Sequence, residues 1–393
     1  MATLGFMEKK KKRSVGKRVL RITIVFAVLL IILAGSYIGY LIYQYNYGTF
    51  KGYRVKHSIE EGSVNSARYK SYKGELLKYS QDGAMTLDAK GKYIWSGSYE
   101  MLAPIVDTCG NYVVVADQAG KQFYIYDETG SVNNITVDYS ILDIQIASQG
   151  VVAVLMQEDN QAYIRVYDKQ GKLRGEISKD FAGAGLPLSI ALSNDGTKVI
   201  ASFLDVSSGK IKTNVVCYGM DETARNEEQQ FIGGVIYDGE IVAKVDFITN
   251  DIACFYKEQG FSLYSLKRKL SSDPIIEKTF DVGVRSIFSS SSYLGFVLDS
   301  SEEKYLHKVV LYDLKGKVVL EQNINFDYDN VTINDEEILF YNHSECYIMN
   351  VKGKERFQHR FDENIHAMSY ASKDKYYVIY GNRIEIIQLK GRK

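Results

Sequence analysis

The side chains best suited to metal chemistry gather near the end of the chain. The candidate ligands are His343, His359, Asp362, Glu363 and His366. Imidazole nitrogens and carboxylate oxygens are ligands for Zn²⁺ and other divalent ions. Their spacing matches no established metal motif, however, and surface loops carry such residues freely. We therefore favour solvated loops and keep a metal site at these five residues as the alternative.

Three other segments invite a chemical interpretation. Residues 327–330 and 334–337 are acidic, but neither has the glycine and terminal glutamate of an EF-hand loop, so we expect solvated charge. Residues 181–187 are rich in glycine, but no helix is predicted after them to supply an anion-binding N-terminus. We expect a connecting loop there. The sequence contains no nucleophile elbow, and it predicts no catalytic residue and no cofactor.

The element that must position all these residues is a hairpin motif repeated eight times. Its clearest copy is Phe-Tyr-Ile-Tyr-Asp-Glu-Thr-Gly at residues 123–130. From Leu87 onward, equivalent positions follow at intervals of 39, 41, 51, 46, 48, 37 and 38 residues. The copies at Tyr218 and Tyr264 are degenerate. A period near 40 residues with strand-like units is typical of a β-propeller.

The chemistry of the motif is that of a turn. The residues before each Asp alternate between apolar and polar, which is strand periodicity. The Asp carboxylate can accept a backbone N–H two residues on, and the Gly supplies the positive φ that a short hairpin needs. A row of acidic or metal sites would use the same residues. We favour turns, one per blade, on the face opposite the variable loops.

Two further strands fit between successive motifs, so each unit has the four strands of a propeller blade. We predict an all-β fold of eight blades, or seven if one degenerate unit is an insertion. The eighth unit ends without a fourth strand, because only two residues follow Gly391. The alternating segment 53–59 has no unit of its own, and we expect it to pair into the last blade and close the ring.

The N-terminal region predicts a membrane anchor. Residues 22–43 contain no charge, and 22 residues of helix span the ~30 Å hydrocarbon core. Residues 1–21 carry eight basic groups and one acid, so the positive-inside rule keeps them in the cytoplasm. The rest of the chain has a formal charge of −7, which does not suit nucleic acid. We assign 44–52 to a tether and 53–393 to an extracytoplasmic propeller.

Cleavage is the competing interpretation of the anchor, since Ala34-Gly35-Ser36 resembles a weak signal-peptidase site. The apolar stretch continues seven residues past Ser36, so we favour an uncleaved signal-anchor. Ser36 also stands where a lipoprotein box requires Cys, so lipidation is not supported. The four cysteines fall in four different units, and we expect buried free thiols: Cys109, Cys217, Cys254 and Cys346.

Two motifs carry a resemblance to known propellers. Asp-Ala-Lys-Gly-Lys-Tyr-Ile-Trp at 88–95 resembles the blade motif of quinoprotein-like propellers, in which Trp docks each blade onto its neighbour. Ser-Asn-Asp-Gly-Thr-Lys at 193–198 resembles a turn of WD-repeat-like and lactonase-like propellers. The single tryptophan, Trp95, occupies the docking position, so the resemblance implies the fold and not quinone chemistry. The whole plan also resembles an uncharacterised family of Gram-positive, single-span, membrane-anchored propellers.

These observations favour a binding or scaffold module in the cell membrane. Its partner would be a protein, a peptide or an envelope component, presented to loops outside the membrane. The alternative is an extracytoplasmic metal-assisted hydrolase or lactonase-like enzyme that uses the late histidines and acids. The variable loops after Glu176, Asp221 and Phe357 are the places where we expect the function to lie.

Overall fold

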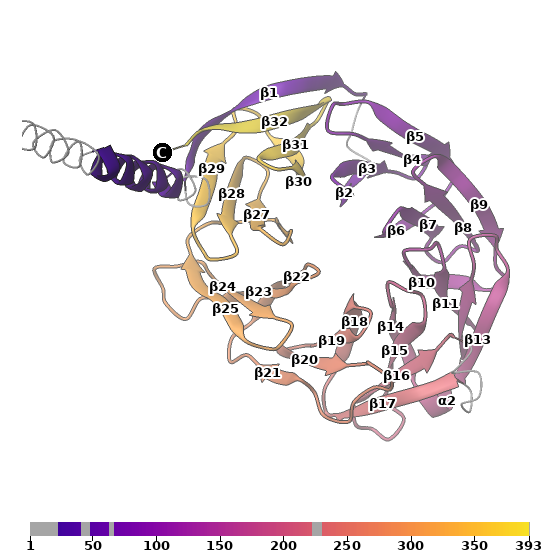
Figure 1. Ribbon diagram of the computed structural model, residues 1–393. Coiled ribbons are helices and arrows are strands. Elements are labelled where there is room, and N and C mark those ends of the chain that lie inside the picture. Colours follow the sequence, from indigo (N-terminus) through magenta and orange to yellow (C-terminus); the bar gives the residue numbers. More distant parts are fainter. Residues whose placement is uncertain (1–22, 41–47, 63–66, 222–229, 393) are drawn as a thin grey trace, which may run out of the picture. The chain divides into compact units, whose positions relative to one another are not determined.

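The chain forms a ring of eight four-stranded β-sheets and, before it in the sequence, an apolar helix (Figure 1). The computed structural model describes residues 23–40, 48–62, 67–221 and 230–392. Gly52–Leu389 form one unit, and the helix belongs to the other. The prediction of an all-β propeller with eight blades is confirmed, and the alternative of seven is wrong.

The helix spans Thr23–Tyr40 and has the length and composition needed to cross a membrane. Its 18 residues give about 27 Å at 1.5 Å per residue, close to the thickness of the hydrocarbon core. The basic tail 1–21, the ends of the predicted span and residues 44–47 of the tether lie outside the described residues.

The first four blades follow the order of the chain, and every blade is an antiparallel meander whose first strand lies nearest to the centre of the ring (Figure 1). Blade 1 is β2 (Arg68–Tyr72), β3 (Glu75–Tyr79), β4 (Gly83–Leu87) and β5 (Tyr93–Ser98). Blade 2 is β6 (Pro104–Cys109), β7 (Tyr112–Asp117), β8 (Gln122–Asp127) and β9 (Gly130–Thr136). Blade 3 is β10 (Ser140–Ile146), β11 (Val152–Glu158), β12 (Gln161–Tyr167) and β13 (Leu173–Asp180). Blade 4 is β14 (Leu186–Leu192), β15 (Lys198–Asp205), β16 (Lys212–Gly219) and β17 (Phe231–Asp238).

The remaining blades continue this order until the last, which takes its fourth strand from the start of the chain. Blade 5 is β18 (Val242–Thr249), β19 (Ile252–Lys257), β20 (Gly260–Ser265) and β21 (Ile276–Thr279). Blade 6 is β22 (Val284–Ser289), β23 (Tyr293–Asp299), β24 (His307–Asp313) and β25 (Val318–Ile324). Blade 7 is β26 (Asn330–Ile333), β27 (Glu337–Tyr341), β28 (Glu345–Asn350) and β29 (Glu355–Arg360). Blade 8 is β30 (Ile365–Ser372), β31 (Lys375–Tyr380), β32 (Arg383–Arg392) and β1 (Phe50–Glu60).

In blades 1 to 7 the repeated motif lies where the third strand leads into the fourth, and in blade 8 it falls within the third strand, β32. In blade 6, the Asp313 carboxylate accepts the N–H groups of Lys315 and Lys317, both at 2.9 Å. Gly316 follows at φ 80°, a conformation that a residue with a side chain adopts only at a cost. Asn350 makes the same two bonds in blade 7. The turn therefore needs an acceptor oxygen at this position and not a negative charge.

The hydrophobic core lies between the blades and not within one of them. Trp95 of blade 1 stacks on Tyr126 of blade 2, with ring centroids 4.7 Å apart and planes within 3°, which is the docking contact expected for the tryptophan. Farther round the ring, Phe261 of blade 5 stacks on Phe296 of blade 6. Each such fully buried side chain contributes about 2 to 3 kcal/mol. Because apolar side chains point to both faces of a sheet, each blade packs against the blade before it and the blade after it.

Polar side chains of the innermost strands bond one blade to the next. Asp107 of blade 2 accepts the Ile146 N–H at 2.9 Å, and Asp143 of blade 3 accepts the Ile190 N–H at 3.3 Å. A β-bulge recurs early in the first strand of blades 3, 4, 5, 6 and 8. Bulges re-aim side chains and add twist, which suits strands that must curve around a ring.

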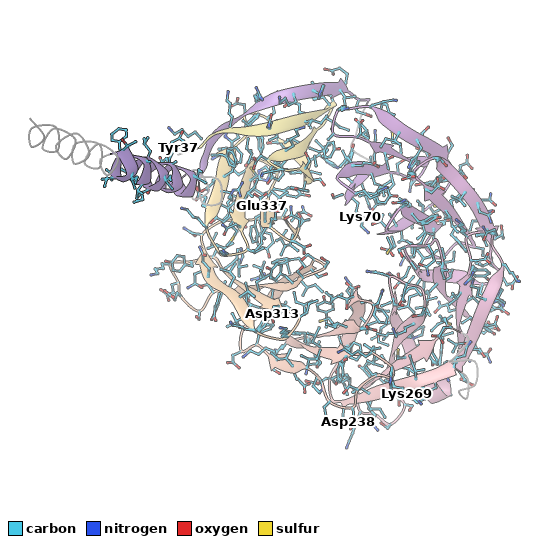
Figure 2. All side chains as sticks on the ribbon, viewed as in Figure 1. Tyr37, Lys70, Asp238, Lys269, Asp313 and Glu337 are labelled. Atoms are coloured by element: carbon cyan, nitrogen blue, oxygen red, sulfur yellow. The ribbon has the colours of Figure 1, made fainter. Side chains whose placement is uncertain are left out.

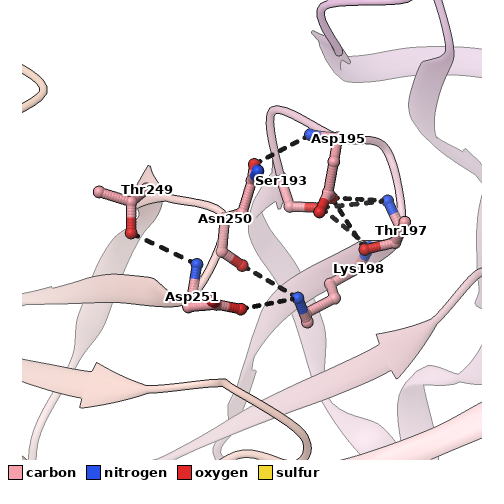
Figure 3. Close-up of polar contacts among 7 residues, drawn as sticks. All are labelled: Ser193, Asp195, Thr197, Lys198, Thr249, Asn250 and Asp251. Carbon is pink, nitrogen blue, oxygen red and sulfur yellow. Dashed lines mark hydrogen bonds and ion pairs between the residues drawn. The ribbon is translucent and has the colours of Figure 1, made fainter.

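The first turn of blade 4 is bonded to the equivalent turn of blade 5 (Figure 3). The Asp195 carboxylate accepts the N–H and hydroxyl of Thr197, and its own N–H donates to the Asn250 side chain at 3.0 Å. Lys198 forms an ion pair with Asp251 at 3.2 Å. Burial raises the pKa of Asp195, but the hydrogen bonds from neighbouring hydroxyls outweigh it and the pKa lies below its usual value.

The ring closes through β1, which contains the segment 53–59 and is the outer strand of blade 8. Arg54 bonds to Gln388 through their side chains, and the Glu61 N–H donates to the Asn382 carbonyl at 2.8 Å. The two contacts show that β1 runs antiparallel to β32. Strand pairing within blade 8 therefore holds the start and end of the propeller together.

Two local expectations are corrected by the structure. The glycine-rich segment contains one helical turn, α2 (Phe181–Ala184), because the Asp180 carboxylate caps it by accepting the Ala182 N–H at 2.8 Å. The four cysteines are free thiols on four blades, as expected, but Cys109 is only half-buried.

Two variants of Asp313 separate the role of its carboxylate as a hydrogen-bond acceptor from the role of its negative charge. We expect Asp313→Ala to lower the free energy of unfolding by about 1 to 2 kcal/mol, because two backbone donors lose their acceptor. Asp313→Asn should stay within about 0.5 kcal/mol of the native chain, because the amide oxygen replaces the acceptor. Urea unfolding measures both. Equal losses in the two variants would show that the charge, and not the acceptor, stabilises the turn.

Candidate functional site

A large cavity of the propeller lies between blades 3 and 4. It has a volume of about 610 Å³ and is mainly apolar. Its walls are the end of β13, the helical turn α2, and the strands β15, β16 and β17. We call it the blade 3/4 groove. A second cavity of about 370 Å³ adjoins the same strand β13, at residues 175–178 and Gln230, and has a polar lining.

Local sequence explains the wall that blade 3 contributes. The cap at Asp180 starts α2, and Gly185 ends it at φ 96°. A Cβ at Gly185 would lie 2.4 Å from the Leu204 carbonyl oxygen, so only glycine lets the chain pass so close to β15. The Asn214 side chain donates to the Ala184 carbonyl at 3.1 Å and fixes the turn to β16.

The blade 4 side of the groove exposes large apolar side chains. Phe231 is 48% exposed and Ile236 is 64% exposed, although both lie in a strand. Tyr218 is buried beside them, with the Lys179 ammonium 5.8 Å from its ring centroid. Among described residues, blade 4 exposes more large apolar side chains than any other blade. Exposed apolar surface of this kind is typical of interaction sites.

Two of the segments singled out in the sequence border these cavities, but the exposed apolar residues of the groove were not among the candidates. These segments follow Glu176 and Asp221, and the two cavities are lined from Gly175 and from Gln230 onward. Phe231 and Ile236 were not singled out. The available signal was the apolar run in β17, where both faces of the strand carry apolar residues.

The five late candidates for metal binding are not brought together as a site. His343 lies in the β27–β28 turn, and Glu363 pairs with Arg383 at 2.9 Å. His359 lies in β29 and not in a loop, where its ring stacks on Phe357. Burial lowers its pKa, which keeps the ring neutral near pH 7.

The other two residues of this set lie in and just before β30. Asp362 is in the connection that leads to this strand, and His366 is the second residue of the strand, 3.4 Å from the Ala67 carbonyl oxygen. Within the described ranges, no group of three or more His, Cys, Asp or Glu side chains is arranged to hold a metal ion.

Glu337 departs from the expectation of solvated charge in segment 334–337. It is buried and pairs with Arg356 at 3.2 Å, while the Tyr376 hydroxyl donates to its other oxygen. Arg356 also pairs with Asp374 of blade 8 at 2.9 Å. Burial raises the pKa of Glu337, although Tyr376 and Arg356 lower it. Glu337, Arg356 and Asp374 compensate one another's charges, and together with Tyr376 they form a buried polar contact between blades 7 and 8.

Charged side chains also gather on the innermost strands. Lys70 lies beside the centre of the ring (Figure 2) and pairs with Asp107 at 3.5 Å. Asp246 of β18 lies 3.8 Å from the Lys244 ammonium. Burial raises the pKa of Asp246 to about 6, and Asp107 adds to the rise while Lys244 and Lys70 oppose it.

The eight four-stranded blades and their order define the protein class as an eight-bladed β-propeller. The chain belongs to the family of unknown function DUF5711, whose sequence profile matches residues 46–389. Among curated proteins, none matches this chain in sequence.

Solved structures of low sequence identity share the fold. A eukaryotic initiation factor is 12% identical with a TM-score of 0.50, over 88% of this chain and 96% of its own. The Neurospora crassa Pan2 WD40 domain is 5% identical with a TM-score of 0.47, over 88% and 97%. Chaetomium thermophilum Raptor is 10% identical with a TM-score of 0.48, over 89% of this chain. The chain spans only 30% of the Raptor chain. At these identities the likeness shows the fold alone.

The raised pKa of Asp246 predicts a pH dependence of stability. Between about pH 4 and pH 6 the folded protein holds a proton that the unfolded chain has lost, so stability falls as pH rises through this window. Asp246→Asn removes this contribution. We expect the native chain to lose about 1 kcal/mol more than the variant between pH 4.5 and pH 7, because the side chain keeps some contact with water. Urea unfolding at both pH values gives the comparison, and parallel losses would rule out a raised pKa.

Proposed function

We propose that the protein is a membrane-anchored binding module whose blade 3/4 groove receives an extended apolar segment of a partner protein. In this proposal residues 22–43 span the cell membrane, 1–21 remain in the cytoplasm, and the propeller from residue 53 lies outside. The groove, with its exposed Phe231 and Ile236, is the observation that carries the proposal.

The shape of the site supports an extended occupant. β17 is the outermost strand of blade 4, so one of its edges has no strand partner in the sheet. On that edge, the Ile232 carbonyl already accepts a hydrogen bond from the Leu270 N–H at 3.0 Å. An added strand can pair with such an edge through backbone bonds while alternate side chains enter a neighbouring pocket. Phe231 and Ile236 lie on the groove side of β17, where those side chains would arrive.

Site-specific photocrosslinking in intact cells tests this proposal. With a benzophenone amino acid at position 236 of the full chain, we expect one discrete crosslinked product. The matched control places the same amino acid at Val319, which is 39% exposed on the outer strand of blade 6. The product at position 236 should decrease at least about tenfold with Phe231→Asp, because a charge in an apolar groove opposes an apolar ligand.

The outcome depends on three comparisons. Equal products at positions 236 and 319, or a product that survives Phe231→Asp, would contradict the groove as a binding site. Phe231→Asp should unfold within about 0.5 kcal/mol of the native chain, because the ring is half exposed. The same cells test the orientation: Leu102→Cys, at a position that is 84% exposed, should react with an impermeant maleimide without permeabilisation.

A further inference from the structure

We propose that one face of the propeller, formed by the turns between third and fourth strands, docks on the anionic head groups of the membrane that holds the anchor. The inference rests on the proposed membrane span and not on the blade 3/4 groove. Two observations carry it: the place where the chain joins the propeller, and the charge of the turns on that face.

The chain joins the propeller at this face. β1 is antiparallel to β32, and Arg54, near the start of β1, contacts Gln388 near the end of β32. The end of β32 is the turn side of blade 8, where the Leu389 N–H bonds to the Asp374 carbonyl at 2.8 Å. The proposed span ends at residue 43 and β1 begins at Phe50, so the link between them reaches at most about 25 Å. The chain thus enters the propeller at the turn face.

The turns on this face carry a repeated Lys-Gly-Lys sequence. It occurs in blades 1, 6 and 7, and we call these six residues the basic arc: Lys90, Lys92, Lys315, Lys317, Lys352 and Lys354. The blade 5 connection contributes the exposed run Lys-Arg-Lys at 267–269, and the blade 8 copy reads Gln-Leu-Lys-Gly at 388–391. Blades 5, 6, 7, 8 and 1 are neighbours in the ring, so the basic turns flank the point where the tether arrives.

The lysines of the basic arc are not needed to form the turns. The Asp313 carboxylate binds the backbone N–H groups of Lys315 and Lys317, not their ammonium groups. Blade 2 makes its turn with Asp127-Glu128-Thr129-Gly130, which contains no basic residue. The same turn therefore forms without positive charge in blade 2.

In the turns nearest to the start of β1, the residue at the capping position is uncharged. Asn350 replaces Asp in blade 7 and makes the same two backbone bonds, and Gln388 stands at the equivalent place in blade 8. In blades 1 and 6, two backbone N–H groups donate to one carboxylate oxygen each of Asp88 and Asp313. The change conserves the turn and raises the positive charge of this face, as contact with phosphate groups requires.

A row of exposed lysines binds an anionic surface through long-range attraction, and each lysine near the surface strengthens binding by roughly fivefold. Salt weakens this attraction over a Debye length of about 10 Å. The tether adds to the effect, because it keeps the face at high local concentration near the lipid. An acidic lipid surface is the occupant that both the charge and the tether favour.

Amine footprinting of the full-length protein in lipid nanodiscs tests the inference. Lysine acylation is compared in phosphatidylcholine discs and in discs with about one third phosphatidylglycerol. We expect Lys90, Lys315 and Lys352 to react at least about threefold more slowly in the anionic discs, and to recover at about 0.5 M NaCl. Lys210, exposed on the opposite face in the β15–β16 connection, should react equally in both.

A variant set completes the test. Replacing Lys90, Lys92, Lys315 and Lys317 with Gln should abolish the protection of Lys352, whereas Lys210→Gln with Lys304→Gln on the opposite face should leave it intact. Equal reactivity of Lys352 in both disc types, or protection of Lys210 instead, would overturn the inference. The measurement is repeated in neutral discs with soluble poly(glycerol phosphate). If this polymer protects Lys352 more strongly than anionic lipid does, the ligand is an anionic polymer and the inference is overturned. Co-elution of the protein with the discs reports the membrane span separately.

Discussion

The pairing of β1 with β32 is the interaction on which the rest of the structure depends. Every other blade takes its four strands from one continuous segment, but blade 8 takes its outer strand from the start of the propeller. Without it, β32 would be an open edge and blades 8 and 1 would lose a shared surface. The same pairing fixes where the tether meets the ring. One set of backbone bonds thus determines both the closure of the fold and the face at which the chain enters the propeller.

The sequence predicts the parts of this fold that local chemistry controls. The capping residue and the glycine of each turn act within about five residues and identify the ends of the third strands. Their repetition at a period near 40 residues identifies the blade count. The bulges of the inner strands and the buried Glu337 are missed, because each depends on another blade. Glu337 stands in an acidic segment of the sequence, and only Arg356 and Tyr376, which come together in space, explain its burial.

The candidate binding site lies where the repeat departs from its own pattern. Blade 4 has a degenerate motif at Tyr218, which ends the longest interval between copies, 51 residues. The connection between β16 and β17 follows it. The strand that follows exposes Phe231 and Ile236 instead of polar residues. In the turns of the basic arc, by contrast, the repeat keeps its pattern, and only the side chains outside the cap and the glycine differ between blades. The scaffold thus tolerates variation at positions that do not cap a turn or fill an interface.

Hydrogen–deuterium exchange on the full-length protein tests the closure of the ring most directly. The segment Ile384–Leu389 of β32 is compared with Cys346–Met349 of β28, the equivalent third strand of blade 7. A closed ring makes both segments interior strands, so the account predicts equally slow exchange in the two. Fast exchange along Ile384–Leu389, as for a strand with one open edge, would contradict the account.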